Sequence, residues 1–110
     1  MNSWKEKMNE EITLYRLAET NHDLTKAVHH LGRAHILSQL SVFAHLRVHF
    51  IMLVFAFKRM DFKEIAGQVL RVLVTIPGHI IGRIPWGNTG WTDVKLTMPL
   101  PIPDDLKQYF

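Results

Sequence analysis

Apolar residues recur at helical spacing through the first three quarters of the chain, and this periodicity constrains the fold more than any other feature. Spacings of three and four residues place side chains on one face of a helix, whereas a strand needs strict alternation. Four such stretches can be separated, at about residues 4–20, 24–38, 41–59 and 62–76. Residues suited to helix N-caps precede three of them, namely Ser3, Asp23 and Asp61. The sequence therefore predicts an all-α protein.

The third stretch is apolar on nearly every side in its second half, which predicts the central and most buried helix. The longest apolar region, residues 36–57, is interrupted by Gln39, His45, Arg47 and His49. A membrane span needs about 20 apolar residues. We therefore expect a buried helix here and no membrane span.

Residues 38 positions apart resemble one another. Asp23 aligns with Asp61, and Leu31 aligns with Val69, in the second and fourth stretches. This offset predicts two antiparallel helical hairpins. The spacing of Ala27, Leu31 and Ala34 is also typical of the second helix of a tetratricopeptide repeat. An antiparallel four-helix bundle would give much of the same periodicity, so both architectures remain open.

Glycine and proline recur in the sequence after Gly82 and exclude another long helix. We expect residues 83–110 to form an extended, Pro-rich C-terminal strap laid against the helices of residues 1–82. A short strand pair around Gly87-Asn88-Thr89-Gly90 is an additional expectation, and so is a last helical turn that begins at Asp104-Asp105-Leu106. At 110 residues, these parts suit a single domain.

Composition limits the chemistry that the chain can perform. It has no cysteine, which excludes disulfides, thiolate metal sites and a cysteine nucleophile. The formal charge is only +3, and the basic residues are spread singly, unlike the basic stripe of a nucleic-acid-binding protein. The N-terminus carries charges and no apolar segment of the secretory type. These features favour a cytoplasmic protein that does not bind nucleic acid.

Histidines are the main candidates for a functional site. In a hairpin that turns near Leu40, His35 lies opposite His45, and His49 follows His45 by one turn. His30 is expected at the level of His49. Such a cluster suits Zn, Cu, Ni or haem iron, whereas the alternative is a set of hydrogen-bonded core histidines.

The surroundings of these histidines limit both their partners and their activity. Residues 24–60 contain no Asp or Glu, so backbone carbonyls would have to accept the ring N–H groups. The segment from His45 to His49 has the histidine spacing of a zinc-protease helix but lacks the glutamate base. A non-enzymatic role is therefore favoured.

A weaker candidate is an anion site. The Gly87-Asn88-Thr89-Gly90 turn could expose backbone N–H groups, with Asn88, Thr89, Arg33 and Arg47 as candidate binding residues. The alternative is a tight structural turn, because the loop lacks the lysine and the following helix of a phosphate-binding loop.

Several segments together resemble a known family. They are residues 30–39, 45–49, 67–71, 87–90 and 99–103. In combination they are similar to DUF3703, a small bacterial family of unknown function. The resemblance implies a bacterial protein of about this length and implies no activity. The chain has Gly32 where the family pattern has an acidic residue, so any role of that acidic residue is lost here.

Two functional hypotheses follow from the sequence. The first is a non-enzymatic protein that binds a transition metal or haem through His35, His45 and His49, with His30 as a further ligand. The second is a helical-repeat protein that binds a protein partner or a second copy of itself and whose histidines are structural. Trp4, Met8 and the ends of the strap are the contacts expected for the second role.

Overall fold

Four α-helices form the protein in a computed structural model that describes residues 3–110. Their bounds are α1 Trp4–Thr20, α2 Leu24–Ser38, α3 Val42–Lys58 and α4 Phe62–Ile81, followed by a 3-10 helix at Asp104–Tyr109. The described residues include no strand, so the strand pair expected near Gly87 does not form. The all-α prediction is confirmed, while residues 1 and 2 of the predicted domain lie outside the described part.

The helix starts follow from the predicted caps. The side chain of Ser3 accepts a hydrogen bond from the backbone N–H of Glu6, and Asp23 and Asp61 do the same for Lys26 and Glu64. Each cap satisfies a backbone donor that has no partner within the helix. Local sequence therefore sets where α1, α2 and α4 begin.

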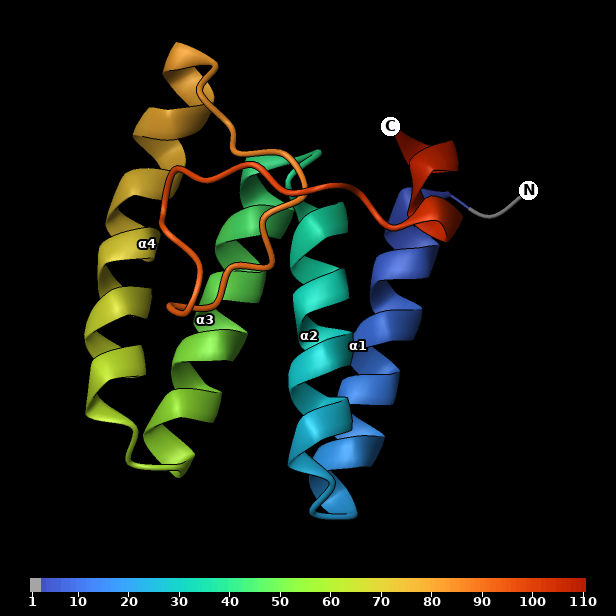
Figure 1. Cartoon of the computed structure of the whole chain (residues 1–110), viewed down its shortest axis with the longest axis vertical. Helices are drawn as coiled ribbons and strands as arrows, with labels where there is room; N and C mark the ends of the chain where they lie inside the picture. Colours follow the sequence, from blue (N-terminus) through green and yellow to red (C-terminus); the bar gives the residue numbers. More distant parts are fainter. Residues whose placement is uncertain (1–2) are drawn as a thin grey trace.

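The helices pack as two antiparallel hairpins, as the 38-residue offset predicted. α1 packs mainly on α2, and α3 packs mainly on α4, with a smaller interface between α2 and α3 (Figure 1). One hydrophobic cluster lies between α1, α2 and α3 and also includes Trp91 and Leu106 from beyond the helices. The central interface between α2 and α3 is therefore where residues from both hairpins meet.

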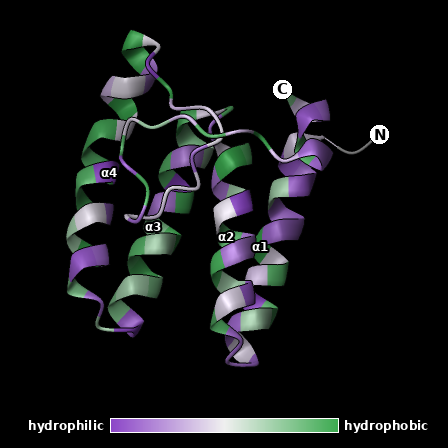
Figure 2. Cartoon of the chain, viewed as in Figure 1, coloured by the Kyte–Doolittle hydropathy of each residue, from purple (hydrophilic) through white to green (hydrophobic). Residues whose placement is uncertain are grey.

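The third helix is less buried than its composition predicted. His45, Val48, His49 and Met52 lie inside, but Phe43 is 79% exposed and Phe57 is 60% exposed. α4 has a similar apolar surface, and Figure 2 shows how strongly hydrophobic residues dominate both helices. The exposed apolar side chains of the second hairpin are Phe43, Phe50, Val54, Phe57, Phe62, Val69, Leu70, Leu73, Ile76, Ile80 and Ile81. A helix that is apolar on nearly every side was expected in the core, but in this fold the neighbouring helices cover only part of the surface of α3.

The fourth helix passes through the proline where an end or a kink was predicted. It continues beyond Pro77 to Ile81 and ends at Gly82, whose φ of 72° lies in the left-handed region. By length and hydropathy alone α4 could cross a membrane, and 17% of that segment is buried within the domain. A single such helix is weak evidence for a span, and the polar side of α4 binds other parts of the domain through Gln68 and Arg71.

Residues 83–103 contain no helix or strand. They run across the end of the domain where α2 ends and α3 begins (Figure 1). Side chains of the helices hold this C-terminal segment. Gln39 donates to the carbonyl of Pro85 and accepts from the N–H of Gly87, and Trp91 donates to the carbonyl of Val28. The 3-10 helix at Asp104–Tyr109 follows, where a last helical turn was expected to begin, so the chain is not extended up to residue 110.

Gly32 is explained by the position of Trp91. A β-carbon at position 32 would lie 3.3 Å from Nε1 of Trp91, so a larger side chain would push on the indole. Glycine in a helix interior costs about 1 kcal/mol relative to alanine. Close packing of the indole on α2 accounts for this residue.

Candidate metal centre

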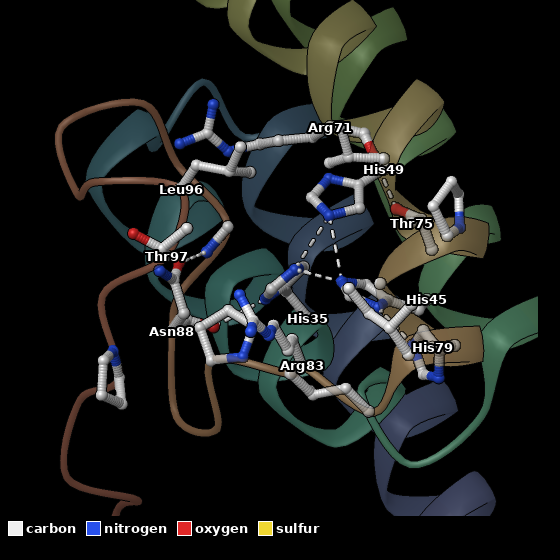
Figure 3. Close-up of a pocket in the computed structure, with 18 residues that line it drawn as sticks. His35, His45, His49, Arg71, Thr75, His79, Arg83, Asn88, Leu96 and Thr97 are labelled. Carbon is white, nitrogen blue, oxygen red and sulfur yellow. Dashed lines mark hydrogen bonds between the residues drawn. The ribbon is translucent and has the colours of Figure 1, made fainter.

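Three buried histidines meet at the interface between α2 and α3. The Nε2 atom of His35 lies 2.9 Å from that of His45 and 3.0 Å from that of His49, and the Nε2 atoms of His45 and His49 are 3.1 Å apart (Figure 3). Their candidate ligand atoms all lie within 4.8 Å of one another. We call these residues the histidine triad. The hairpin register and the one-turn spacing predicted from the sequence bring them together.

The C-terminal segment orients the first member of the triad. Nδ1 of His35 lies 2.7 Å from the backbone carbonyl of Asn88. A carbonyl oxygen only accepts, so the Nδ1–H donates and Nε2 carries a lone pair. A backbone carbonyl was the type of partner expected in a helix pair that lacks Asp and Glu.

A glutamine on α4 orients the second member. Nδ1 of His49 lies 2.8 Å from Oε1 of Gln68, whose amide nitrogen donates to Oε2 of Glu64 and to the carbonyl of Gly90. Both of these partners accept, and this fixes the orientation of the amide. His49 therefore donates from Nδ1 and also presents a lone pair at Nε2.

Another histidine contacts the third member. Nδ1 of His45 lies 2.9 Å from Nε2 of His79, which is half-buried on α4. When His45 donates to His79, all three Nε2 atoms of the triad present lone pairs to one another. With the opposite tautomer, one proton serves three nitrogens, and two lone pairs still face each other.

The electrostatics of the triad favour neutral rings. Burial lowers the pKa of His45 to about 3 and that of His49 to about 4, and burial holds the pKa of His35 well below its ordinary value. Repulsion between the rings lowers the pKa values of His35 and His45 further. Neutral imidazole is the form that binds metal ions.

The triad lines a pocket of about 500 Å³. The rest of its wall comes from the second half of α4 and from the C-terminal segment, and Figure 3 shows the side chains of Thr75, Asn88 and Leu96 around the same space. This volume is within the range of small-molecule sites. The histidine side chains therefore border a cavity that is larger than an ion.

A family model described as "Protein of unknown function (DUF3703)" matches residues 2–110. The chain belongs to this family. No curated protein and no solved structure gives a significant match. For this DUF3703 protein, the geometry of the site is thus the main guide to function.

The structure does not bring His30 to the triad. Its Nδ1 lies 2.8 Å from Oε2 of Glu11 on α1. His30 lies five positions before His35 on α2. Five positions at about 100° each turn its side chain well away from α3. His29, one position earlier, is exposed.

The residues proposed for an anion site lie in separate interactions. Arg33 donates to Glu11 and Asp105, and Arg47 donates to Asn9. In the turn, the N–H of Gly90 donates to the side chain of Asn88. Thr89, the remaining candidate, is half-buried and lies between Asn88 and Gly90 in the sequence. The turn at residues 87–90 therefore presents the carbonyl of Asn88 to the triad, rather than a set of N–H groups to an anion.

Sequence reasoning missed two residues that orient the triad, Gln68 and His79. Both come from α4, whose rotation about its axis relative to α3 could not be derived from hairpin geometry alone. Gln68 lies on the same face as Arg71 and Thr75, so three polar residues at helical spacing within an apolar helix were the available signal.

Proposed function

We propose that this DUF3703 protein binds a divalent transition metal ion through Nε2 of His35, His45 and His49. The observation that supports this most is the convergence of lone pairs. His35 and His49 must donate from Nδ1, so their Nε2 lone pairs lie 3.0 Å apart in a buried site. A cation between these nitrogens turns an unfavourable contact into coordinate bonds.

The separations of the nitrogens suit such an ion. Ligands about 2.0 Å from a tetrahedral zinc ion are about 3.3 Å apart. The measured separations of 2.9–3.1 Å are slightly shorter, so small shifts of the rings would complete the site. The partners on Nδ1 are of the kind that fix ring orientation in metal sites.

A bare ion fits this arrangement better than haem. Three imidazole nitrogens share one small space, whereas haem iron takes its protein ligands along the axis of the porphyrin. Three histidines with an open fourth position are typical of catalytic zinc sites. Zinc is therefore the first ion to test, followed by cobalt, copper and nickel.

Calorimetric titration of the metal-free full chain with Zn²⁺ tests the proposal. We expect binding of one ion per chain with a micromolar or lower Kd. Replacement of a triad residue, as in His49→Ala, should weaken binding by about 100-fold or more, since one of three coordinate bonds is lost. His29→Ala is the matched control because His29 is exposed on α2 and lies outside the triad.

Two results would contradict the proposal. One is the absence of zinc, cobalt, copper and nickel binding to a folded chain. The other is equally tight binding by a folded His45→Ala, His49→Ala double variant. Circular dichroism of each variant separates loss of ligands from loss of structure, and His49→Gln provides a more conservative change at the same position.

A second candidate function is self-association through the apolar face of the second hairpin. Leu73 is 68% exposed and Ile80 is 78% exposed. Between Gly67 and Gly82 the only Lys, Arg, Asp or Glu is Arg71, and Arg71 is buried. Such a face offers no charge to a polar partner or to lipid headgroups. A second copy of the chain presents the same apolar surface, as in two-fold symmetric dimers.

Trp4 and Met8 on α1 were the residues expected to contact a partner. They are only partly suitable, because Met8 is buried and Trp4 is half-buried.

Sedimentation over a range of concentrations should show a dimer that Leu73→Glu dissociates. Thr13→Glu, on the exposed side of α1, is the control. A monomer at every concentration, or binding to lipid vesicles that Leu73→Glu abolishes, would reject the dimer.

A further inference from the structure

The pocket beside the triad carries positive charge and no carboxylate. The three ligands are neutral imidazoles, and no Asp or Glu is among the residues that line the cavity. Arg71 and Arg83 are among them. A divalent ion held by the triad would therefore keep its full charge within the pocket, because the first ligands supply no negative charge.

Arg71 adds a second, buried positive charge. The residue is 6% exposed, and its guanidinium donates to the backbone carbonyls of Gly67 and Val94. It forms no salt bridge with any carboxylate in the part of the chain that the structure describes. Glu64 and Asp93 attract it from outside the pocket. The pocket thus combines the charge of a bound ion with those of Arg71 and Arg83, and no carboxylate lines it.

The rest of the wall is mostly apolar. Its members include Val74, Pro77, Ile81, Ile84, Leu96 and Pro99. Sites for small molecules commonly pair such walls with a few placed polar groups. A ligand that matches this site carries one negative group at the histidine end and an apolar body along the wall.

We propose that the pocket binds a small organic carboxylate, with the carboxylate at the open coordination position of the metal ion and an aliphatic body against the wall around Val74 and Leu96. This inference rests on the metal site proposed above. Arg71 acts as a positioning residue that attracts the anion, and its own hydrogen bonds to Gly67 and Val94 remain in place. The carboxylate supplies the negative charge that the three imidazoles lack.

Cobalt provides a direct readout, because the visible absorption of Co²⁺ changes when an exogenous group enters its coordination sphere. The full chain is first loaded with Co²⁺ and then titrated with hexanoate, acetate, hexanol and hexylamine. We expect saturable spectral changes with hexanoate and, more weakly, with acetate. Each buried methylene contributes about fourfold in affinity, so hexanoate should bind at least about tenfold tighter than acetate. Hexanol and hexylamine should leave the spectrum unchanged.

A pair of variants tests the position of the aliphatic body. Val74→Phe places a larger side chain in the pocket wall and should weaken hexanoate binding by about tenfold while acetate binding stays within about twofold. Leu73→Phe is the matched control, because Leu73 is adjacent in sequence and 68% exposed. Arg71→Lys should bind hexanoate more tightly than Arg71→Gln. Neither variant should bind Co²⁺ more weakly than the unmodified chain, because the charge of Arg71 repels positive charge at His35 and His49.

The outcomes separate this inference from the metal site itself. Failure of Co²⁺ to bind rejects the metal site and the carboxylate site together. Binding of Co²⁺ without any response to hexanoate rejects only the carboxylate site. The same conclusion follows if hexanol changes the spectrum as strongly as hexanoate, or if the metal-free chain binds hexanoate equally well by calorimetry.

Discussion

Gly90 lies directly against the imidazole of His35. A β-carbon at position 90 would lie 2.6 Å from Cδ2 of that ring, and the φ of Gly90 is +87°. The same residue also accepts a hydrogen bond from Gln68, which orients His49. One glycine therefore lies beside one ligand of the triad and supports the partner of another.

Gly90→Ala should destabilise the protein by about 2–4 kcal/mol, because backbone strain and a clash with His35 add together. Gly82→Ala isolates the strain, since Gly82 also has a positive φ but has no atom within 4 Å of the new β-carbon. That control should cost about 1 kcal/mol. Chemical denaturation measures both changes, and equal losses for the two variants would refute the clash.

Gln68→Ala should weaken zinc binding by about 10–100-fold, because His49 loses the acceptor that holds its ring and its tautomer. Gln108→Ala, in the exposed part of the 3-10 helix, should leave the Kd unchanged. Calorimetry provides the measurement. Unchanged affinity in the folded Gln68→Ala variant would show that this residue has no part in the site.

The metal-free protein should lose stability on acidification. In the unfolded chain the triad histidines bind protons near pH 6.5, whereas burial lowers their folded pKa values, to about 3 for His45 and about 4 for His49. The unfolded state thus binds more protons below pH 6.5. The free energy of unfolding should be constant above that pH and should fall as the pH decreases toward 4, with a slope of up to about 1.4 kcal/mol per pH unit for each histidine.

Denaturation at pH 7.5 and at pH 5 checks this dependence. A folded His45→Ala variant should show a smaller loss, and exposed His22→Ala should show the full loss. Equal stability of the unmodified chain at both pH values would contradict the assignment of neutral, buried rings.

A separate ion-pair group should affect stability without affecting metal binding. Glu11 is 2% exposed and binds both His30 and Arg33, and Arg33 also pairs with Asp105. Glu11→Ala leaves Arg33 without its buried partner, removes the hydrogen-bond partner of His30, and should cost about 3 kcal/mol. Asp105→Ala should cost less than about 1 kcal/mol, because the Asp105 side chain is 59% exposed. A change in zinc affinity in either variant would link this group to the triad.

The fold was largely predictable because its signals are local. The caps Ser3, Asp23 and Asp61 and the apolar spacing set the helices, and the turn near Leu40 sets the register of His35 with His45. Exposure was less predictable. Phe43 and Phe57 lie on a surface, because the apolar residues of α3 exceed what one layer of neighbouring helices can cover.

The ligands were also more predictable than their partners. His45 and His49 share a helix face by spacing alone, whereas the contact between His35 and Asn88 joins residues 53 positions apart through a segment without periodicity. His30 failed to join the triad because height along a helix does not determine which side a residue faces. Rotation about the helix axis depends on the neighbouring elements, and periodicity within one hairpin does not encode it.

The three ligand atoms of the triad come from the last turn of α2 and from two successive turns near the start of α3. Each ring is nevertheless held from outside these two helices, by Asn88, Gln68 and His79. The pocket gives an ion a path to solvent, but the rings themselves could turn away from the ion only after residues 83–103 or α4 move. The lifetime of the bound metal would then be set by local opening of the chain rather than by the strength of the coordinate bonds. Metal exchange should proceed at the same rate as amide hydrogen exchange in residues 83–103 or in α4.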